Sequence, residues 1–86
     1  MSDSRSVPAL DETERKLLAI WRDVLENPDV DLNDSFLDLG GDSLSAMMCT
    51  SRIEKTFGVE IAIEYFFMDD GTVSTLATLI NQHRAK

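Results

Sequence analysis

The chain has 86 residues, of which 43% are hydrophobic, and it carries a formal net charge of −8. This length allows one domain with a modest core, and no run of about 18 apolar residues is available for a transmembrane helix. The acidic balance excludes proteins whose surface must neutralise the phosphates of nucleic acids. The start of the chain lacks the pattern of a signal peptide, so the expected compartment is the cytoplasm.

The first predicted helix spans about residues 10–26. Asp11 and Glu14 have the spacing of a capping box, in which each side chain bonds the other's backbone amide. Apolar side chains then recur at helical spacing and predict one buried face. They are Leu17, Trp21 and Val24. The helix should end at Asn27, because a residue that precedes proline avoids the helical backbone region.

The segment from about Asn27 to Asp42 is predicted to be a long structured loop, since it exceeds the usual connection between packed helices. Apolar residues spread through it should fasten it across the bundle. They are Val30, Leu32, Phe36, Leu37 and Leu39. Residues 26–42 hold six acidic and no basic side chains, which indicates either a solvated loop or a negative surface that steers basic partners. A calcium loop is not indicated, because Asp34 and Gly40 replace the glycine and glutamate of an EF-hand.

The second predicted helix spans about residues 43–57, with Asp42 as N-cap and Gly58 as left-handed C-cap. One set of apolar residues follows core spacing: Ala46, Cys49, Ile53 and Phe57. A second set lies on another side: Leu44, Met47 and Met48. Either the helix is buried around most of its circumference, or the second set is exposed for a partner. We favour the exposed surface, because methionine adapts to several partner shapes. Cys49, the only cysteine, is expected to be a small buried hydrophobe.

The remaining elements are a short helix at about residues 63–68 and a last helix from Thr72 to about His83. Val59, Ile61 and Ile63 have the alternating spacing of a strand, but with no second strand to pair with they predict an extended link. The expected fold is all-α, a small four-helix bundle with three longer helices, one short third helix and a long structured loop between the first two. Residues 1–9 are expected to be a flexible tail before a domain at residues 10–83.

Ser43 is the candidate functional residue, and its neighbours Gly41-Asp42-Ser43-Leu44 also match the opening motif of a class of serine esterases. That chemistry needs a histidine base, and the only histidine is His83, with Ile80 where those esterases have aspartate. We therefore predict no catalytic residue and no metal site. A serine that begins a helix after two glycines suits a phosphodiester, because helix N-termini favour anions and glycines leave the hydroxyl accessible.

Residues 34–44, Asp-Ser-Phe-Leu-Asp-Leu-Gly-Gly-Asp-Ser-Leu, resemble the attachment motif of the phosphopantetheine-dependent carrier proteins. The similarity covers about residues 10–82 and includes residues 51–61. It also includes four pairs: Ile20-Trp21, Val24-Leu25, Thr72-Val73 and Leu76-Ala77. Trp21, the paired glycines and Ser51-Arg52-Ile53 are most similar to the peptidyl carrier domains of nonribosomal peptide synthetases. The segment from Phe67 to Thr72 departs from their pattern, because it is one residue longer and lacks the common proline.

The resemblance implies a 4′-phosphopantetheine arm on Ser43, with Gly41, Asp42 and Leu44 around the attachment point. A phosphopantetheinyl transferase would supply the arm from coenzyme A with magnesium. The arm would hold an aminoacyl, peptidyl or acyl group as a thioester for nonribosomal peptide or polyketide biosynthesis, including that of antibiotics. The chain itself would be a non-catalytic carrier.

The implied partners are the transferase, an adenylation enzyme or acyltransferase, and condensing or tailoring enzymes. They are expected to dock on Leu44, Met47, Met48 and Ser51 of a monomeric, freestanding carrier. The alternative hypothesis is a protein-interaction module that uses the Leu44, Met47 and Met48 face without a cofactor. Partner binding that does not require Ser43 would distinguish this alternative.

Overall fold

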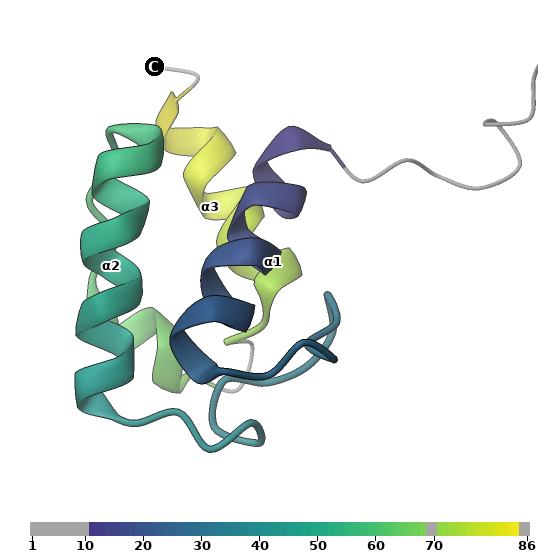
Figure 1. Cartoon of the computed structure of the whole chain (residues 1–86). Coiled ribbons are helices and arrows are strands. Elements are labelled where there is room, and N and C mark those ends of the chain that lie inside the picture. The colour runs from purple at the N-terminus through teal and green to yellow at the C-terminus, as the bar shows by residue number, and fades with distance from the viewer. Residues whose placement is uncertain (1–10, 69–70, 85–86) are drawn as a thin grey trace, which may run out of the picture.

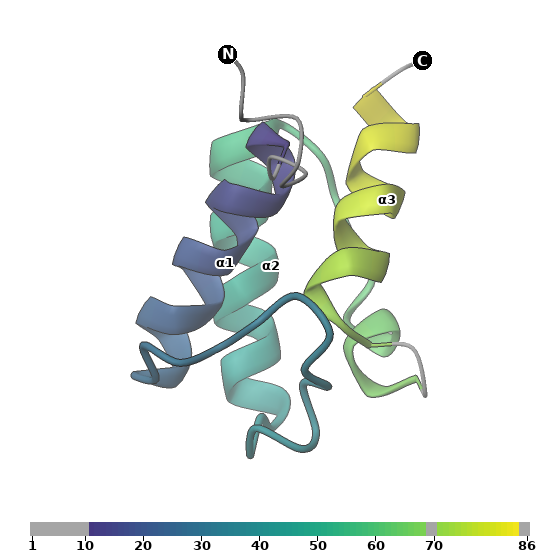
Figure 2. The same cartoon turned by 90° about the vertical axis from the view of Figure 1, so that its right-hand side faces the viewer.

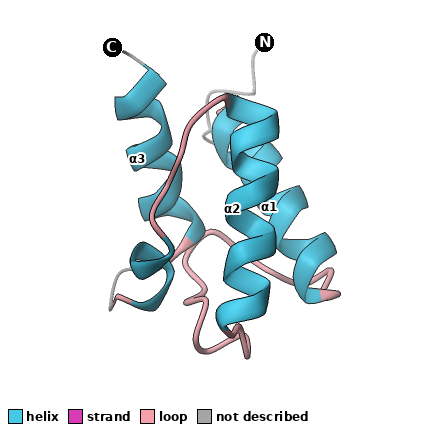
Figure 3. Ribbon diagram, turned by 90° about the vertical axis from the view of Figure 1, so that its left-hand side faces the viewer, coloured by secondary structure: helices cyan, strands magenta, loops and turns pink. Residues whose placement is uncertain are grey.

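The computed structural model describes residues 11–68 and 71–84, and these residues form helices and loops without a named strand (Figures 1 and 3). In chain order the elements are α1 (Glu12–Leu25), α2 (Ser43–Phe57), η2 (Ile63–Phe67) and α3 (Val73–Arg84). Helix α1 packs against both α2 and α3, while η2 packs against α2. The all-α expectation is confirmed. The expected flexible tail at residues 1–9 lies outside the described residues.

The short third helix corrects the predicted four-helix bundle. The described residues contain three α-helices, and the fourth element, η2, is a 3₁₀ helix of five residues. Such a helix is tighter than an α-helix and is used in short pieces, because its hydrogen-bond geometry is poorer. Its one fully buried side chain is Phe66, which anchors it to the core. No helix in the described part of the chain is long and apolar enough to cross a membrane.

Helix α1 begins at the predicted capping box. The Asp11 carboxylate accepts a hydrogen bond of 2.7 Å from the Glu14 amide, and the Glu14 carboxylate accepts one of 3.2 Å from the Asp11 amide. The helix ends at Leu25, because Glu26 adopts the left-handed conformation with φ 53°. The predicted capping box is confirmed, and the helix ends one residue before the predicted boundary at residue 26, while the predicted start at residue 10 lies outside the described residues.

The core is built around an aromatic cluster of Trp21, Phe36 and Phe66. The ring centroids of Phe36 lie 5.1 Å from Trp21 and 4.9 Å from Phe66, both edge to face, and Trp21 and Phe66 are 5.9 Å apart. Aliphatic side chains from all three α-helices surround the cluster. The fully buried ones are Leu17, Ala46, Ile53, Val73, Leu76 and Ile80. One core therefore holds together α1, the long loop, α2, η2 and α3.

The loop at residues 26–42 crosses from the end of α1 toward the start of α3 and returns to α2 (Figure 2). Val30 and Phe36 are buried as predicted, but Leu37 is 50% exposed, so that part of the prediction is wrong. The residue after an inward-facing Phe36 turns outward, and the irregular spacing of the apolar residues along the loop did not reveal this. Two hydrogen bonds to the α3 side fix the crossing: Phe36 N to Gly71 O at 2.9 Å and Ser74 N to Leu32 O at 3.0 Å.

Further polar contacts close the bundle at its two ends. The Arg22 guanidinium donates to the Val30 carbonyl from Nη2 at 2.8 Å and from Nε at 3.2 Å, which fastens the loop to α1. At the opposite end, the Thr13 hydroxyl donates to Asn81 Oδ1 at 2.6 Å, and Asn81 Nδ2 donates to Asp11 at 3.1 Å. These bonds hold the start of α1 beside the end of α3.

Candidate functional site

The two glycines before α2 are required for different physical reasons. Gly40 has φ 85°, a left-handed conformation that side chains with a Cβ adopt at a cost. Gly41 has an ordinary φ, but a Cβ atom there would overlap the aromatic ring of Phe36. The turn is closed by hydrogen bonds from Gly40 N to Leu37 O and from Gly41 N to Phe36 O, each 3.0 Å. The glycine pair thus brings the chain tightly around a core residue just before the helix begins.

Asp42 caps α2 and directs its carboxylate along the helix. Its Oδ1 accepts a hydrogen bond of 2.9 Å from the Ser45 amide and one of 2.8 Å from the Ser45 hydroxyl. The bond from the Ser45 amide is the main cause of a pKa that lies below the ordinary value of an aspartate. The carboxylate is therefore committed to the helix start, and its negative charge is turned toward Ser45 rather than toward Ser43.

Ser43 is the first residue of α2 and its side chain is exposed. The first-turn amides of a helix have no intrahelical acceptor, and together with the helix dipole they favour an anionic group nearby. The predicted helix bounds of residues 43–57, the Asp42 cap and the left-handed Gly58 cap are all confirmed. The site is therefore an accessible hydroxyl at a helix N-terminus, presented by a turn that the core holds in place.

A histidine base is not positioned near Ser43. Helix α2 begins at the lower end of the bundle in Figure 1, while α3, which carries His83, ends at the upper end. The His83 Nδ1 lies 2.8 Å from the Leu79 carbonyl one turn earlier on α3. Since a serine nucleophile needs its base within hydrogen-bond reach, the two residues do not form a catalytic pair.

Leu44, Met47 and Met48 form an exposed apolar patch on the side of α2 that faces away from the core. Their exposed fractions are 65%, 53% and 42%, so the predicted exposure is confirmed. With Ser51 they line an open depression of about 350 Å³. Arg52 and Lys55 line the end of this depression that is farther along α2 from Ser43. The binding of partners on this patch stays a prediction.

The core-facing side of α2 buries Ala46, Cys49 and Ile53, as predicted, while Phe57 is only half-buried. Burial raises the pKa of the Cys49 thiol to about 12, although Arg52 acts in the opposite direction. Because the reactive form of cysteine is the thiolate, Cys49 is inert at neutral pH. Its role is packing.

The acidic side chains of the loop serve partly to stabilise its turns. Asp31 Oδ1 accepts from the Leu32 amide at 2.8 Å, and Asp34 Oδ2 accepts from the Asp31 amide at 2.9 Å. Within residues 11–68 and 71–84, no three His, Cys, Asp or Glu side chains gather closely enough to hold a metal ion. Several acidic groups stay exposed on the loop that leads to Ser43, including Asp38.

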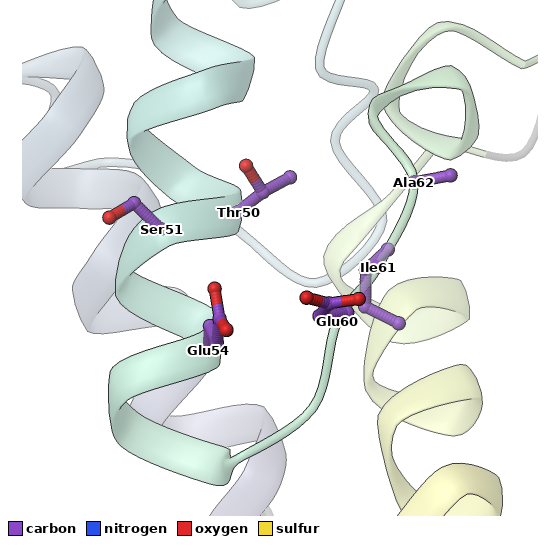
Figure 4. Close-up of a pocket in the computed structure, with 6 residues that line it drawn as sticks. All are labelled: Thr50, Ser51, Glu54, Glu60, Ile61 and Ala62. Carbon is purple, nitrogen blue, oxygen red and sulfur yellow. The ribbon is translucent and has the colours of Figure 1, made fainter.

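A second depression was not foreseen from the sequence. It is a groove of about 520 Å³ between α2 and residues 60–62, which connect α2 to η2 (Figure 4). It is lined by Thr50, Ser51, Glu54, Glu60, Ile61 and Ala62, and we call it the acidic groove. Only the folded chain places Glu60 opposite Glu54, so no local pattern could have indicated this groove. Ser51 borders both the groove and the depression over the apolar patch.

Comparison with known families gives one match over most of the chain. Residues 15–80 match the model of the phosphopantetheine attachment site family. One of the plipastatin synthase proteins of Bacillus subtilis (strain 168) is 44% identical over 70 residues, which is 81% of this chain and 3% of that protein. Tyrocidine synthase 3 of Brevibacillus parabrevis is 41% identical over 64 residues, which is 74% of this chain and 1% of that protein. The chain thus corresponds to a small part of the length of such relatives.

The solved structures of similar shape include carrier proteins. A chain in the complex of the phosphopantetheine transferase Sfp with coenzyme A and a peptidyl carrier protein superposes with a TM-score of 0.80 at 27% identity. That match covers 86% of this chain and 95% of the other. BlmI, a type-II acyl carrier protein of Streptomyces verticillus involved in bleomycin biosynthesis, gives a TM-score of 0.75 at 28% identity, covering 83% and 84% of the two chains.

Proposed function

This chain belongs to the phosphopantetheine attachment site family, and from that premise we propose that Ser43 is its attachment residue. The matched region, residues 15–80, contains Ser43 near its centre. The observation that carries the proposal is the exposed Ser43 hydroxyl on the first turn of α2, directly after the glycine turn and the Asp42 cap.

The residues around Ser43 fit a phosphodiester. Gly40 and Gly41 place no side chain beside the hydroxyl, so an enzyme can approach it. Asp42 keeps its carboxylate on Ser45, which lessens its repulsion of an anion on the neighbouring serine. The dipole of the 15-residue helix α2 favours negative charge at this end. Leu44 lies next to Ser43 and offers an apolar contact to whatever covers the site.

The attachment reaction joins the Ser43 oxygen to a phosphorus atom of coenzyme A, with loss of adenosine 3′,5′-bisphosphate. A phosphopantetheinyl transferase with magnesium performs this step and takes up the hydroxyl proton. When bound, the arm supplies a terminal thiol that holds the cargo as a thioester. This chain contributes no acid, base or nucleophile after loading, so it is a non-catalytic carrier, and its task is to hold Ser43 accessible on a rigid helix end.

The cargo class we propose is an aminoacyl or peptidyl group in nonribosomal peptide biosynthesis. The support is the similarity to plipastatin synthase and to the peptidyl carrier in the Sfp complex. An acyl group of polyketide type is the second candidate, supported by the similarity to BlmI. An adenylation enzyme or acyltransferase would load the carrier, and condensing or tailoring enzymes would use it. An adenylation partner fits the similarity to a carrier solved next to its adenylation domain in McyG, at 35% identity and a TM-score of 0.73.

We further propose that residues 10–83 form the carrier domain, that the carrier acts as a monomer and that it acts in the cytoplasm, where coenzyme A is available. The helices from Glu12 to Arg84 form one core, which supports this extent of the domain. The alternative function, a protein-interaction module without cofactor, rests on the apolar patch alone. Both functions use the same face of α2, so only the chemistry at Ser43 separates them.

The test is modification of the purified chain by the transferase Sfp with coenzyme A and magnesium, read as intact mass. The expected result is a gain of one phosphopantetheinyl group in the wild type and none in Ser43→Ala. Ser45→Ala is the matched control, because Ser45 is on the same helical turn and its hydroxyl bonds Asp42. It should still be modified. An unmodified wild type, or a Ser43→Ala chain that still gains the group, would show that the proposal is wrong.

A further inference from the structure

Gly71, which lies just before α3, has no room for a side chain. A Cβ atom on it would overlap the Phe66 carbonyl oxygen and lie 3.1 Å from the Tyr65 carbonyl oxygen. Both obstacles are backbone atoms, so neither can turn aside as a flexible side chain could. The Gly71 amide also donates to the Met68 carbonyl oxygen at 2.9 Å. The chain therefore closes tightly on η2 at Gly71, and this closure fixes the position of the Gly71 carbonyl group.

The Gly71 carbonyl group holds the long loop from the side of α3. It accepts a hydrogen bond of 2.9 Å from the Phe36 amide. Next to this bond, Ser35 and Thr72 form an isolated antiparallel bridge. Figure 2 shows the loop passing beside the start of α3. The backbone of the loop is thus held in register with the segment that enters α3.

Phe36 also holds the turn that leads to Ser43. Its carbonyl oxygen accepts a hydrogen bond of 3.0 Å from the Gly41 amide, and its ring occupies the space of a Cβ atom on Gly41. Phe36 is fully buried, and its ring contacts Trp21 and Phe66. Because a closely packed core transmits strain, a shift of Phe36 is passed on to Gly41 rather than absorbed.

The attachment reaction makes the chain sensitive to such a shift. The Ser43 oxygen must approach the phosphorus atom of coenzyme A opposite the leaving group, and a displacement of about 1 Å from a reactive geometry can slow a reaction about 100-fold. The exposed face of α2 is held independently of the turn, because Ala46 and Ile53 anchor the helix in the core. A displaced turn should therefore slow the transfer step more than it weakens binding of the carrier.

We propose that Gly71 is a positioning residue for Ser43 in the attachment reaction and that it acts through Phe36. The Gly71 carbonyl group sets the position of Phe36, and Phe36 sets the turn at Gly41 that delivers Ser43 to the transferase. Gly71 itself supplies no chemistry to the reaction. The inference rests on the function proposed above, in which Ser43 receives the arm.

The first test is the kinetics of Gly71→Ala with Sfp, coenzyme A and magnesium over a range of carrier concentrations. The added methyl group forces the backbone at this position away from Phe66 and displaces its carbonyl group from Phe36. At a temperature where urea unfolding shows the variant to be folded, kcat should fall about tenfold while KM stays within about twofold.

The matched control is Ile80→Val. Ile80 is fully buried in α3, about two turns beyond Val73, so the substitution loosens the core without altering the contacts of Gly71 or Phe36. The folded control should keep the wild-type kcat. An equal fall of kcat in both variants would show that any loss of packing slows the reaction, and the proposal would be wrong.

Hydrogen exchange of backbone amides, read by NMR, separates positioning from a general loss of stability. In Gly71→Ala the protection of the Gly41 amide should fall at least about tenfold more than that of the Gly58 amide. The Gly58 amide bonds the Glu54 carbonyl oxygen at the other end of α2 and serves as the internal reference. A role in stability alone would lower the protection of both amides by the same factor, which would also contradict the proposal.

If Gly71→Ala does not fold, phenyllactic acid in place of Phe36 provides the second variant. This change keeps the ring and deletes the amide that donates to Gly71, so kcat must again fall for the proposal to stand. Leucic acid in place of Leu39 is its control, because it deletes the 3.1 Å bond from the Leu39 amide to the Ser35 carbonyl oxygen and leaves Gly71 bonded.

The outcomes for the function and for the inference are distinct. A folded Gly71→Ala chain that is modified with the wild-type kcat would overturn the positioning role and leave Ser43 as the attachment residue. A wild type that Sfp does not modify would instead refute the attachment function, and this inference with it.

Discussion

The ring of Phe36 occupies the space that a Cβ atom on Gly41 would need, so a core residue and the turn before Ser43 form one packing unit. Phe36 in turn contacts Trp21 and Phe66 through its ring and bonds Gly71 through its amide. The position of Ser43 is therefore determined by the aromatic core rather than by the loop alone.

Gly41→Ala tests this relationship. The added methyl group overlaps the Phe36 ring, and overpacking of this kind costs about 1–3 kcal/mol in the free energy of unfolding. Urea unfolding measures the loss. Adding Phe36→Leu to Gly41→Ala should cost less than Phe36→Leu costs in the wild type, because the ring that overlaps the methyl is then gone. Additive effects of the two substitutions would show that the overlap is not the cause.

Asp42 should contribute to the way the free energy of unfolding changes with pH in the acid range. Its pKa is lower in the folded chain than in the unfolded chain, so the ionised cap stabilises the fold above the ordinary aspartate pKa of about 3.9. This contribution is lost as the pH falls through the folded pKa. Asp42→Ala should therefore be less stable than the wild type at neutral pH, and the gap should narrow toward pH 3. A gap that stays constant from pH 7 to pH 3 would argue against a charged cap.

Cys49 should make the free energy of unfolding depend on pH in the alkaline range. Burial raises its pKa to about 12, while the unfolded thiol titrates near 8.5, so folding favours the neutral form. Its contribution to stability is fully present below about pH 8.5 and is lost as the pH rises toward the folded pKa. The stability difference between wild type and Cys49→Ala should fall between pH 8.5 and pH 11. The folded chain should also react slowly with a thiol reagent at pH 8 and rapidly in urea, and equal rates in the two conditions would contradict burial.

Local signals predicted the helices well because their ends depend on nearby residues. Asp11 with Glu14, and Asp42 with Gly58, mark helix ends through contacts over a few positions, and the structure has these caps. Periodicity separated the two apolar sets of α2, and exposure of the second set was favoured because methionine adapts to several partner shapes. The sequence did not reveal why Gly41 must be glycine, since its reason is a ring five residues earlier that the core holds in place.

The acidic groove, like the need for glycine at position 41, depends on residues that only the folded chain brings together. Glu60 faces Glu54 because the chain reverses at Gly58 and its next apolar residues, Val59 and Ile61, enter the core. The exposure of Leu37 was also missed, because apolar residues without regular spacing do not indicate which side of a loop is buried. The helix type of η2 was missed, since a segment of five residues does not distinguish an α-helix from a 3₁₀ helix.

The two faces of α2 can be separated by a pair of substitutions. Met47 is 53% exposed on the apolar patch, and Ile53 is fully buried on the core side. Ile53→Ala should lower the free energy of unfolding by about 2–5 kcal/mol, because it removes buried methyl groups and leaves a cavity. Met47→Glu should leave the helical circular dichroism unchanged and weaken modification by the transferase, because a carboxylate replaces an apolar contact.

In these two variants, the rate of modification at Ser43 and the free energy of unfolding should therefore change independently. At a temperature where it stays folded, Ile53→Ala should be modified at Ser43 at nearly the wild-type rate, since the docking surface is intact. Met47→Glu should show the reverse, a wild-type unfolding midpoint in urea with slower modification. Its defect should persist in 1 M salt, since high salt does not restore the lost apolar contact. Loss of the fold in Met47→Glu would place Met47 in the core and refute the assignment of the apolar patch as a docking surface.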